Sequence, residues 1–129
     1  MNYSLSINNY QKDDINNKLN NENPHTIIEE VLVELRKNLN ILISCFQNKD
    51  SISEAKSKSY SKSLTAIYIL QSSLDFEKGG EIARNLNELY DYCRTNIIKS
   101  FTNKNIDLLS KVLDIVQEIL DGWSSIKNK

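Results

Sequence analysis

The sequence is that of a short and nearly neutral chain. It has 129 residues, of which 40% are hydrophobic and 26% charged, and its formal net charge at pH 7 is −1. A chain of this length makes one domain with one hydrophobic core, and a balanced charge argues against nucleic acid as a partner. No uncharged apolar run of 18 residues occurs, so we expect no membrane insertion.

The first 22 residues differ in composition from the remainder. Asn, Asp and Lys dominate them. Their larger apolar residues include Leu5, Ile7, Tyr10, Ile15 and Leu19. This small apolar area predicts a mobile arm over 1–22, followed by a folded unit over 23–129. The arm lacks the basic start and the continuous apolar segment of a signal peptide, so we expect a cytoplasmic protein.

Two helices are predicted in the first half of the folded unit. Asn23 is a favourable N-cap, and Pro24 suits the first helical position, where an N–H would have no helical partner. Apolar residues then recur every three or four positions, which predicts a helix to about Gln47. A second helix is expected over about 52–73. Its C-terminal half is apolar on one face, whereas its N-terminal half, "SISEAKSKSYSKS", is mostly serine and lysine.

Two further amphipathic segments follow, over about 80–102 and about 106–127, and no window alternates for long enough to predict a strand. The apolar face of the third segment consists of Ile82, Leu86, Leu89, Tyr90, Cys93, Ile97 and Phe101. That of the fourth consists of Leu109, Val112, Leu113, Val116, Ile119, Leu120, Trp123 and Ile126. Four helices of similar length with short loops predict an all-α fold, an antiparallel up-down-up-down four-helix bundle.

Two of the three glycines, Gly79 and Gly80, are adjacent and lie between the second and third helices. Glycine accepts a left-handed backbone at little steric cost and lets backbones approach closely. We therefore expect the chain to turn over 75–80. Glu81 would then stand in the first turn of the third helix, where a negative charge suits the helix dipole.

The sequence lacks the residues on which catalytic and cofactor-binding bundles depend. A di-iron site needs paired Glu-x-x-His motifs, but the only histidine is His25. The only methionine is Met1, and neither a Cys-x-x-Cys-His motif nor a phosphate-binding glycine loop occurs. We therefore expect no metal, no cofactor and no enzymatic activity. Cys45 and Cys93 are expected to be buried, reduced thiols, although the sequence leaves a disulfide between facing helices open.

The stretch "SLDFEKGGEIARNLNELYDYC", residues 73–93, resembles the most characteristic segment of the FliS family, the flagellin-specific secretion chaperones. In that family the second helix ends in a Ser/Thr-Leu-Asp turn, often followed by a Gly-Glu-Ile-Ala step and an Asn-Leu-x-x-Leu-Tyr-x-Tyr helix. The matching positions here are 74–75, 79–83 and 85–92. Weaker similarities are Tyr10-Gln11, Asn23-Pro24 and a last helix that ends near Trp123.

This resemblance implies a cytoplasmic chaperone that binds the C-terminal segment of flagellin. It would prevent premature polymerisation of flagellin and deliver it to the flagellar type III export gate. An amphipathic client helix could lie along the bundle in a helix-in-groove mode. Whether the chain also forms a homodimer stays open at this point.

Eight residues are expected to contact the client. Tyr68, Ile98 and Ile115 lie off the main apolar seams of their helices, and the serine-rich half of the second helix leaves its neighbours incompletely covered. Ile7 and Tyr10 belong to the arm, which we expect to cover the client surface when no client is bound. The segment that resembles the family adds Leu74, Leu86 and Tyr90.

Two other functions remain compatible with these features. A bundle that acts as an adaptor or oligomerising module for a different protein partner would show the same periodicity. A phosphorelay protein would use His25, but phosphotransfer histidines lie in mid-helix, whereas His25 stands beside Pro24 in the first helical turn.

Overall fold

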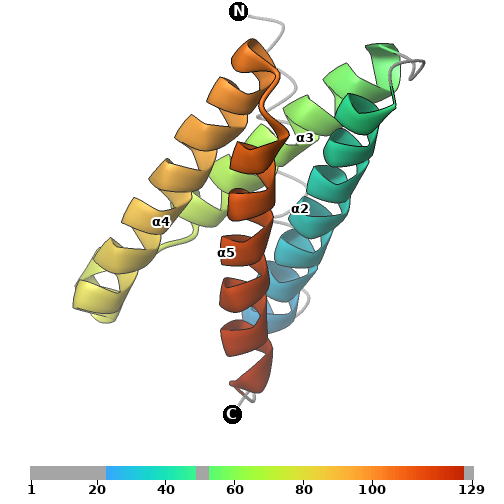
Figure 1. Cartoon of the computed structure of the whole chain (residues 1–129). Coiled ribbons are helices and arrows are strands. Elements are labelled where there is room, and N and C mark those ends of the chain that lie inside the picture. The colour runs from blue at the N-terminus through green and yellow to red at the C-terminus, as the bar shows by residue number, and fades with distance from the viewer. Residues whose placement is uncertain (1–22, 49–52, 127–129) are drawn as a thin grey trace, which may run out of the picture.

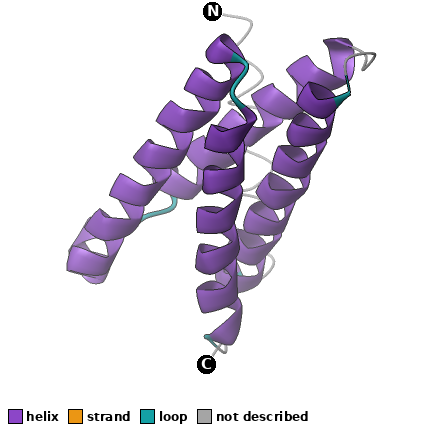
Figure 2. Cartoon of the chain, viewed as in Figure 1, coloured by secondary structure: helices purple, strands orange, loops and turns teal. Residues whose placement is uncertain are grey.

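The computed structural model describes residues 23–48 and 53–126, which form four helices joined by short connections (Figures 1 and 2). The helices are α2 (Pro24–Gln47), α3 (Ser53–Ser72), α4 (Phe76–Asn103) and α5 (Ile106–Ser125). Successive helices run in opposite directions, and contacts join α2 to α3, α3 to α4, α4 to α5 and α5 back to α2. The predicted all-α four-helix bundle is confirmed, and the predicted arm over 1–22 lies outside the described residues.

We call the end of the bundle that holds the α4–α5 connection the upper end, and the end that holds the α3–α4 turn the lower end, as they stand in Figure 1. The core extends through both halves and is made mainly of aliphatic side chains from all four helices. Its largest fully buried members include Ile27, Leu32, Leu35, Leu39, Leu42, Ile67, Leu70, Ile97, Leu109, Val112 and Val116.

Side-chain caps set the starts of three helices. Asn23 Oδ1 accepts the His25 N–H at 2.8 Å, and Pro24 takes the first helical position as predicted. Asp75 caps α4 in the same way, and Asn105 caps α5. Each cap satisfies backbone N–H groups that have no partner within the first helical turn.

The start of α4 differs from the predicted turn over 75–80. Asp75 starts the helix at Phe76, and the chain then kinks at Gly80, whose φ is 51° and ψ −125°. This backbone conformation is rare for residues with a side chain, so Gly80 is required for its φ. Gly79 has a different role, because a Cβ there would lie only 2.9 Å from the Cβ of Ala83.

The serine-rich half of α3 packs through small side chains. Ser59 and Ser63 are buried, and their hydroxyls donate to backbone carbonyls of the preceding turn at 3.1 and 2.8 Å. Ala66 continues this buried series toward the lower end. Side chains of this size let α3 lie close to α2, the helix with which it shares its most extensive contact.

Three aromatic rings from three different helices pack together at the upper end. Tyr60 of α3 stacks on Phe101 of α4 with ring centroids 4.0 Å apart, and Phe46 of α2 meets Phe101 edge-on at 6.2 Å. Lys56 Nζ lies 4.2 Å from the centre of the Phe46 ring, a cation–π contact. The upper end is therefore closed by side chains of α2, α3 and α4.

Candidate binding surface

A glutamine side chain of α3 hydrogen-bonds to the lower half of α4. Gln71 Nε2 of α3 donates to Asn87 Oδ1 at 3.0 Å and to Asp91 Oδ1 at 2.9 Å. Asn87 and Asp91 are one helical turn apart and mark the flank of α4 that faces α3. Because α4 contacts α3 and α5, the opposite flank of α4 is the one that faces α5.

That opposite flank becomes steadily more exposed toward the lower end. Ile82, Leu89 and Asn96 are seven residues apart and therefore share one face, and their exposed fractions are 72%, 39% and 8%. The adjacent series shows the same change, since Leu86 is half-buried and Cys93 is fully buried. Side chains that follow the same seven-residue spacing on α4 are thus buried in the upper half and exposed in the lower half.

The facing flank of α5 repeats this gradient. Gln117 accepts a hydrogen bond from Arg36 Nη1 of α2 at 3.2 Å and so marks the flank that faces α2. On the other flank, Val112 is fully buried, Ile119 is half-buried and Ile126 is 57% exposed. Figure 1 shows the geometric cause, because α4 and α5 lie close at the upper end and diverge toward the lower end.

We refer to the exposed and half-buried apolar residues of these two flanks as the α4–α5 apolar surface. It consists of Ile82, Leu86, Leu89, Ile115, Ile119 and Ile126. The two helices are antiparallel and joined by a short connection, so Ile82 and Ile126 lie at similar heights along the bundle. An exposed apolar surface contributed by two adjacent helices is typical of a protein-interaction site.

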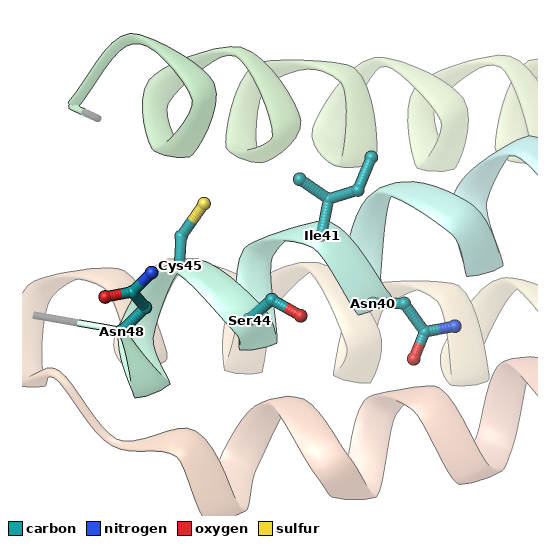
Figure 3. Close-up of a pocket in the computed structure, with 5 residues that line it drawn as sticks. All are labelled: Asn40, Ile41, Ser44, Cys45 and Asn48. Carbon is teal, nitrogen blue, oxygen red and sulfur yellow. The ribbon is translucent and has the colours of Figure 1, made fainter. Parts of the chain in front are cut away.

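A separate cavity of about 360 Å³ lies near the upper end of α2. Its described lining consists of Asn40, Ile41, Ser44, Cys45 and Asn48 (Figure 3). Ile41 and Cys45 point toward α3. The cavity therefore belongs to the α2–α3 side of the bundle and lies apart from the α4–α5 apolar surface.

Two ionisable side chains of α4, Cys93 and Tyr90, are buried and have raised pKa values. Burial raises the pKa of the Cys93 thiol to about 12. Burial also raises the pKa of Tyr90 to about 12, and the nearby Cys93 adds to this shift. Cys45 and Cys93 are both buried, as predicted. Within 23–48 and 53–126, no group of three or more His, Cys, Asp or Glu side chains is arranged to hold a metal ion, and no helix is suited to crossing a bilayer.

Comparison with known proteins assigns the family. The model of the family described as flagellar protein FliS matches residues 6–129. The chain belongs to the FliS family. Among relatives of this FliS-family protein, the flagellar secretion chaperone FliS of Vibrio cholerae is 28% identical over 94% of this chain and 88% of its own length. The flagellar secretion chaperone FliSB of Pseudomonas aeruginosa is 29% identical over 92% of this chain and 93% of its own.

A shorter match is more similar. The flagellar secretion chaperone FliS of Salmonella typhimurium is 36% identical over 76 residues, which is 58% of this chain and 56% of that protein. The resemblance found in residues 73–93 therefore identified the family correctly.

The structure brings two of the predicted contact residues of this FliS-family protein together. Leu86 and Ile115 both belong to the α4–α5 apolar surface. Tyr68 of α3 and Ile98 of α4 are exposed at 45% and 41%, and neither belongs to the α4–α5 apolar surface.

The other predicted residues lie elsewhere. Leu74 follows α3 and packs half-buried against the core. Tyr90 is a core residue with 3% of its side chain exposed. Ile7 and Tyr10 lie outside the described residues.

Several residues of the surface were expected in the core instead. Ile82, Leu89 and Ile126 were assigned to the apolar seams of their helices, and the structure leaves 72%, 39% and 57% of them exposed. One signal was present, because Leu89 and Tyr90 are consecutive and both apolar, which makes the apolar face of α4 wider than a single helix contact can bury. The sequence did not indicate which part of that face would stay uncovered.

Proposed function

We propose that this protein is a cytosolic export chaperone that binds the C-terminal segment of flagellin, keeps it from polymerising early and aids its delivery to the flagellar type III export apparatus. The observation that supports this function is the α4–α5 apolar surface on a bundle of the FliS family. The relatives named above are flagellar secretion chaperones, and none of them is named as an enzyme.

The shape of the surface supports one mode of binding. A flagellin tail is a short amphipathic segment that is only marginally helical in water. Laid along the diverging halves of α4 and α5, its apolar face would cover Ile82 and Leu89 on one side and Ile119 and Ile126 on the other. This is the helix-in-groove mode of peptide recognition.

The energetic scale indicates that this surface does not act alone. Burying a fully exposed Leu or Ile contributes roughly 1.5–3 kcal/mol, but three residues of the surface are already half-buried. Ordering the client costs roughly 2–5 kcal/mol. The free energy gained by covering the remaining exposed residues is therefore of similar size to this cost. Net affinity requires further contacts, for which the exposed Tyr68 and Ile98 are candidates.

The arm is a candidate for covering the client surface in the absence of flagellin. Its apolar residues, among them Leu5, Ile7 and Tyr10, stand in a polar segment that has too little apolar area to fold by itself. Deleting residues 1–18 should then change client affinity, because client and arm would no longer compete. Titration curves that match those of the full chain would remove the arm from this proposal.

A pair of matched substitutions tests the surface. Leu89 and Val33 are both 39% exposed, but Val33 belongs to α2, which contributes no residue to the α4–α5 apolar surface. Leu89→Asp places a charge where an apolar client face must lie, and desolvating that charge should weaken binding at least about tenfold. Val33→Asp should leave binding within about twofold. Calorimetric titration with a flagellin C-terminal peptide measures both, and wild-type protein should form a 1:1 complex.

The outcomes separate the candidate functions. If the wild-type chain fails to bind the peptide, an adaptor role with a different partner becomes the better explanation. If both variants bind like the wild type, flagellin is a client but the α4–α5 apolar surface is not its site.

A further inference from the structure

Two residues at the lower end fasten α5 to α2. Trp123 Nε1 of α5 donates to the backbone carbonyl of His25 at 2.9 Å, and His25 Nε2 lies 2.8 Å from the backbone carbonyl of Trp123. The two rings stack almost in parallel, with centroids 4.7 Å apart and an interplanar angle of 8°. We call this reciprocal contact the His25–Trp123 clasp.

The chemistry of the clasp fixes the donor. A backbone carbonyl oxygen only accepts, so His25 Nε2 must carry a proton to bond to it. Trp123 is near the C-terminal end of α5, and its carbonyl also accepts the Ile126 N–H at 3.2 Å. A ring N–H directed at carbonyls of a helix C-terminus is favoured by the helix dipole. Both the neutral Nε2–H form and the imidazolium satisfy this contact.

Other contacts strengthen the same pairing. Ser124 hydrogen-bonds to Glu29, and Gln117 to Arg36, so side chains of three residues in the lower half of α5 bond to α2. On the other side of the bundle, Gln71 joins α3 to the lower half of α4. The lower end is therefore made of two fastened pairs, α2 with α5 and α3 with α4, and the α4–α5 apolar surface lies where these pairs diverge.

We propose that the His25–Trp123 clasp keeps the α4–α5 apolar surface open by holding the end of α5 against α2 and away from α4. Without the clasp, the end of α5 can swing toward α4 and bury Ile82 and Ile126 against each other, since burying apolar surface is favourable. The client then has to compete with this closed form. The apparent dissociation constant rises in inverse proportion to the fraction of molecules that stay open. His25 and Trp123 act in this scheme as positioning residues that need not touch the client.

A distance measurement tests the clasp directly. Spin labels are attached to cysteines introduced by Asn85→Cys in α4 and Glu118→Cys in α5, since both positions are exposed. Cys45 is replaced by alanine so that it takes up no label. Cys93 is kept, because it is fully buried. Electron–electron double resonance should give one long distance with wild-type His25 and a shorter or broader distribution in His25→Ala. An unchanged distribution in a folded His25→Ala variant overturns the proposal.

A conservative variant guards against simple unfolding. Trp123→Phe keeps an aromatic ring and the backbone carbonyl but loses the indole N–H donor and part of the ring, so it should shift the distance in the same direction by less. His25→Gln keeps a side-chain N–H donor and should restore much of the wild-type distance. If His25→Ala does not fold, Trp123→Phe decides: an unchanged distribution overturns the proposal and a shifted one supports it.

The consequence for binding rests on the proposed function. His25→Ala should weaken binding of the flagellin C-terminal peptide about tenfold if only about one molecule in ten stays open. The neighbouring exposed residue Thr26 provides a matched control, and Thr26→Ala should bind like wild type. Failure of the wild-type protein to bind the peptide refutes the proposed function and leaves the distance test intact. Wild-type binding together with unchanged affinity in His25→Ala refutes the clasp proposal alone.

Discussion

The upper and lower ends of this bundle are built from the same seven-residue apolar pattern and end in different states. At the upper end Phe46, Tyr60 and Phe101 meet across three helices and close the core. At the lower end the helices separate into two pairs, and Ile82 and Ile126 stay exposed. The comparison teaches that heptad spacing selects the residues of a flank, whereas the convergence of two helices decides whether that flank is core or surface.

The largest expected difference between the ends is in stability. Phe101→Ala removes the ring shared by both aromatic contacts of the upper end and should lower the free energy of unfolding by about 3 kcal/mol. Ile82→Ala at the lower end should change it by less than about 0.5 kcal/mol, because 72% of this side chain is already exposed. Urea unfolding followed by circular dichroism measures both. Equal losses would contradict the open lower end.

The glycines at the start of α4 test the geometry that presents Ile82. Gly80→Ala forces a residue with a Cβ into φ 51° and should cost about 1–3 kcal/mol. Gly79→Ala should cost a similar amount, because its Cβ would crowd that of Ala83 at 2.9 Å. Replacing Gly80 by D-alanine through chemical synthesis should be tolerated, and equal destabilisation by both enantiomers would contradict the backbone explanation.

The pH dependence of stability reports on the burial of Cys93 and Tyr90 in the core. Burial holds the pKa of Cys93 at about 12, whereas the thiol of the unfolded chain ionises near its usual pKa of about 8.5. Above that pH the unfolded state binds fewer protons than the folded state, so stability falls as pH rises toward 12. The slope from Cys93 is up to about 1.4 kcal/mol per pH unit. Tyr90 adds a similar loss above about pH 10.

Urea titrations at pH 8, 9 and 10 measure this slope, and the variant Cys93→Ala should show a shallower one. An identical slope in the two proteins would contradict a buried thiol at position 93. A cysteine introduced by Leu86→Cys lies two helical turns below Cys93 on the same face and would be half-buried. It should therefore react faster with a thiol reagent than Cys93 does.

The smallest expected effect is a gain. Gly122 lies within α5, and a Cβ there would have no heavy atom within 4 Å. Gly122→Ala should therefore stabilise the protein by about 0.5–1 kcal/mol through helix propensity. A loss of stability in thermal unfolding would show that the lower end of α5 needs a flexible backbone.

The sequence by itself determined the helices and the family. The apolar spacing located four helices within a few residues, Asn23 and Pro24 marked the start of α2, and residues 73–93 pointed to FliS. These features are local, because hydrogen bonding, capping and periodicity act over one or two turns. The early start of α4 at Phe76 was missed, since the carboxylate of Asp75 capped a turn ahead of the glycines.

Only the tertiary structure decided which apolar residues stay uncovered. Ile82, Leu89 and Ile126 have the same spacing as their buried counterparts Asn96 and Val112, so periodicity could not distinguish them. Their exposure depends on the divergence of α4 from α5, which is set by contacts between residues far apart in the chain, such as His25 with Trp123 and Gln71 with Asp91. Such pairings leave no periodic trace in the sequence, because each one depends on how whole helices are placed against one another.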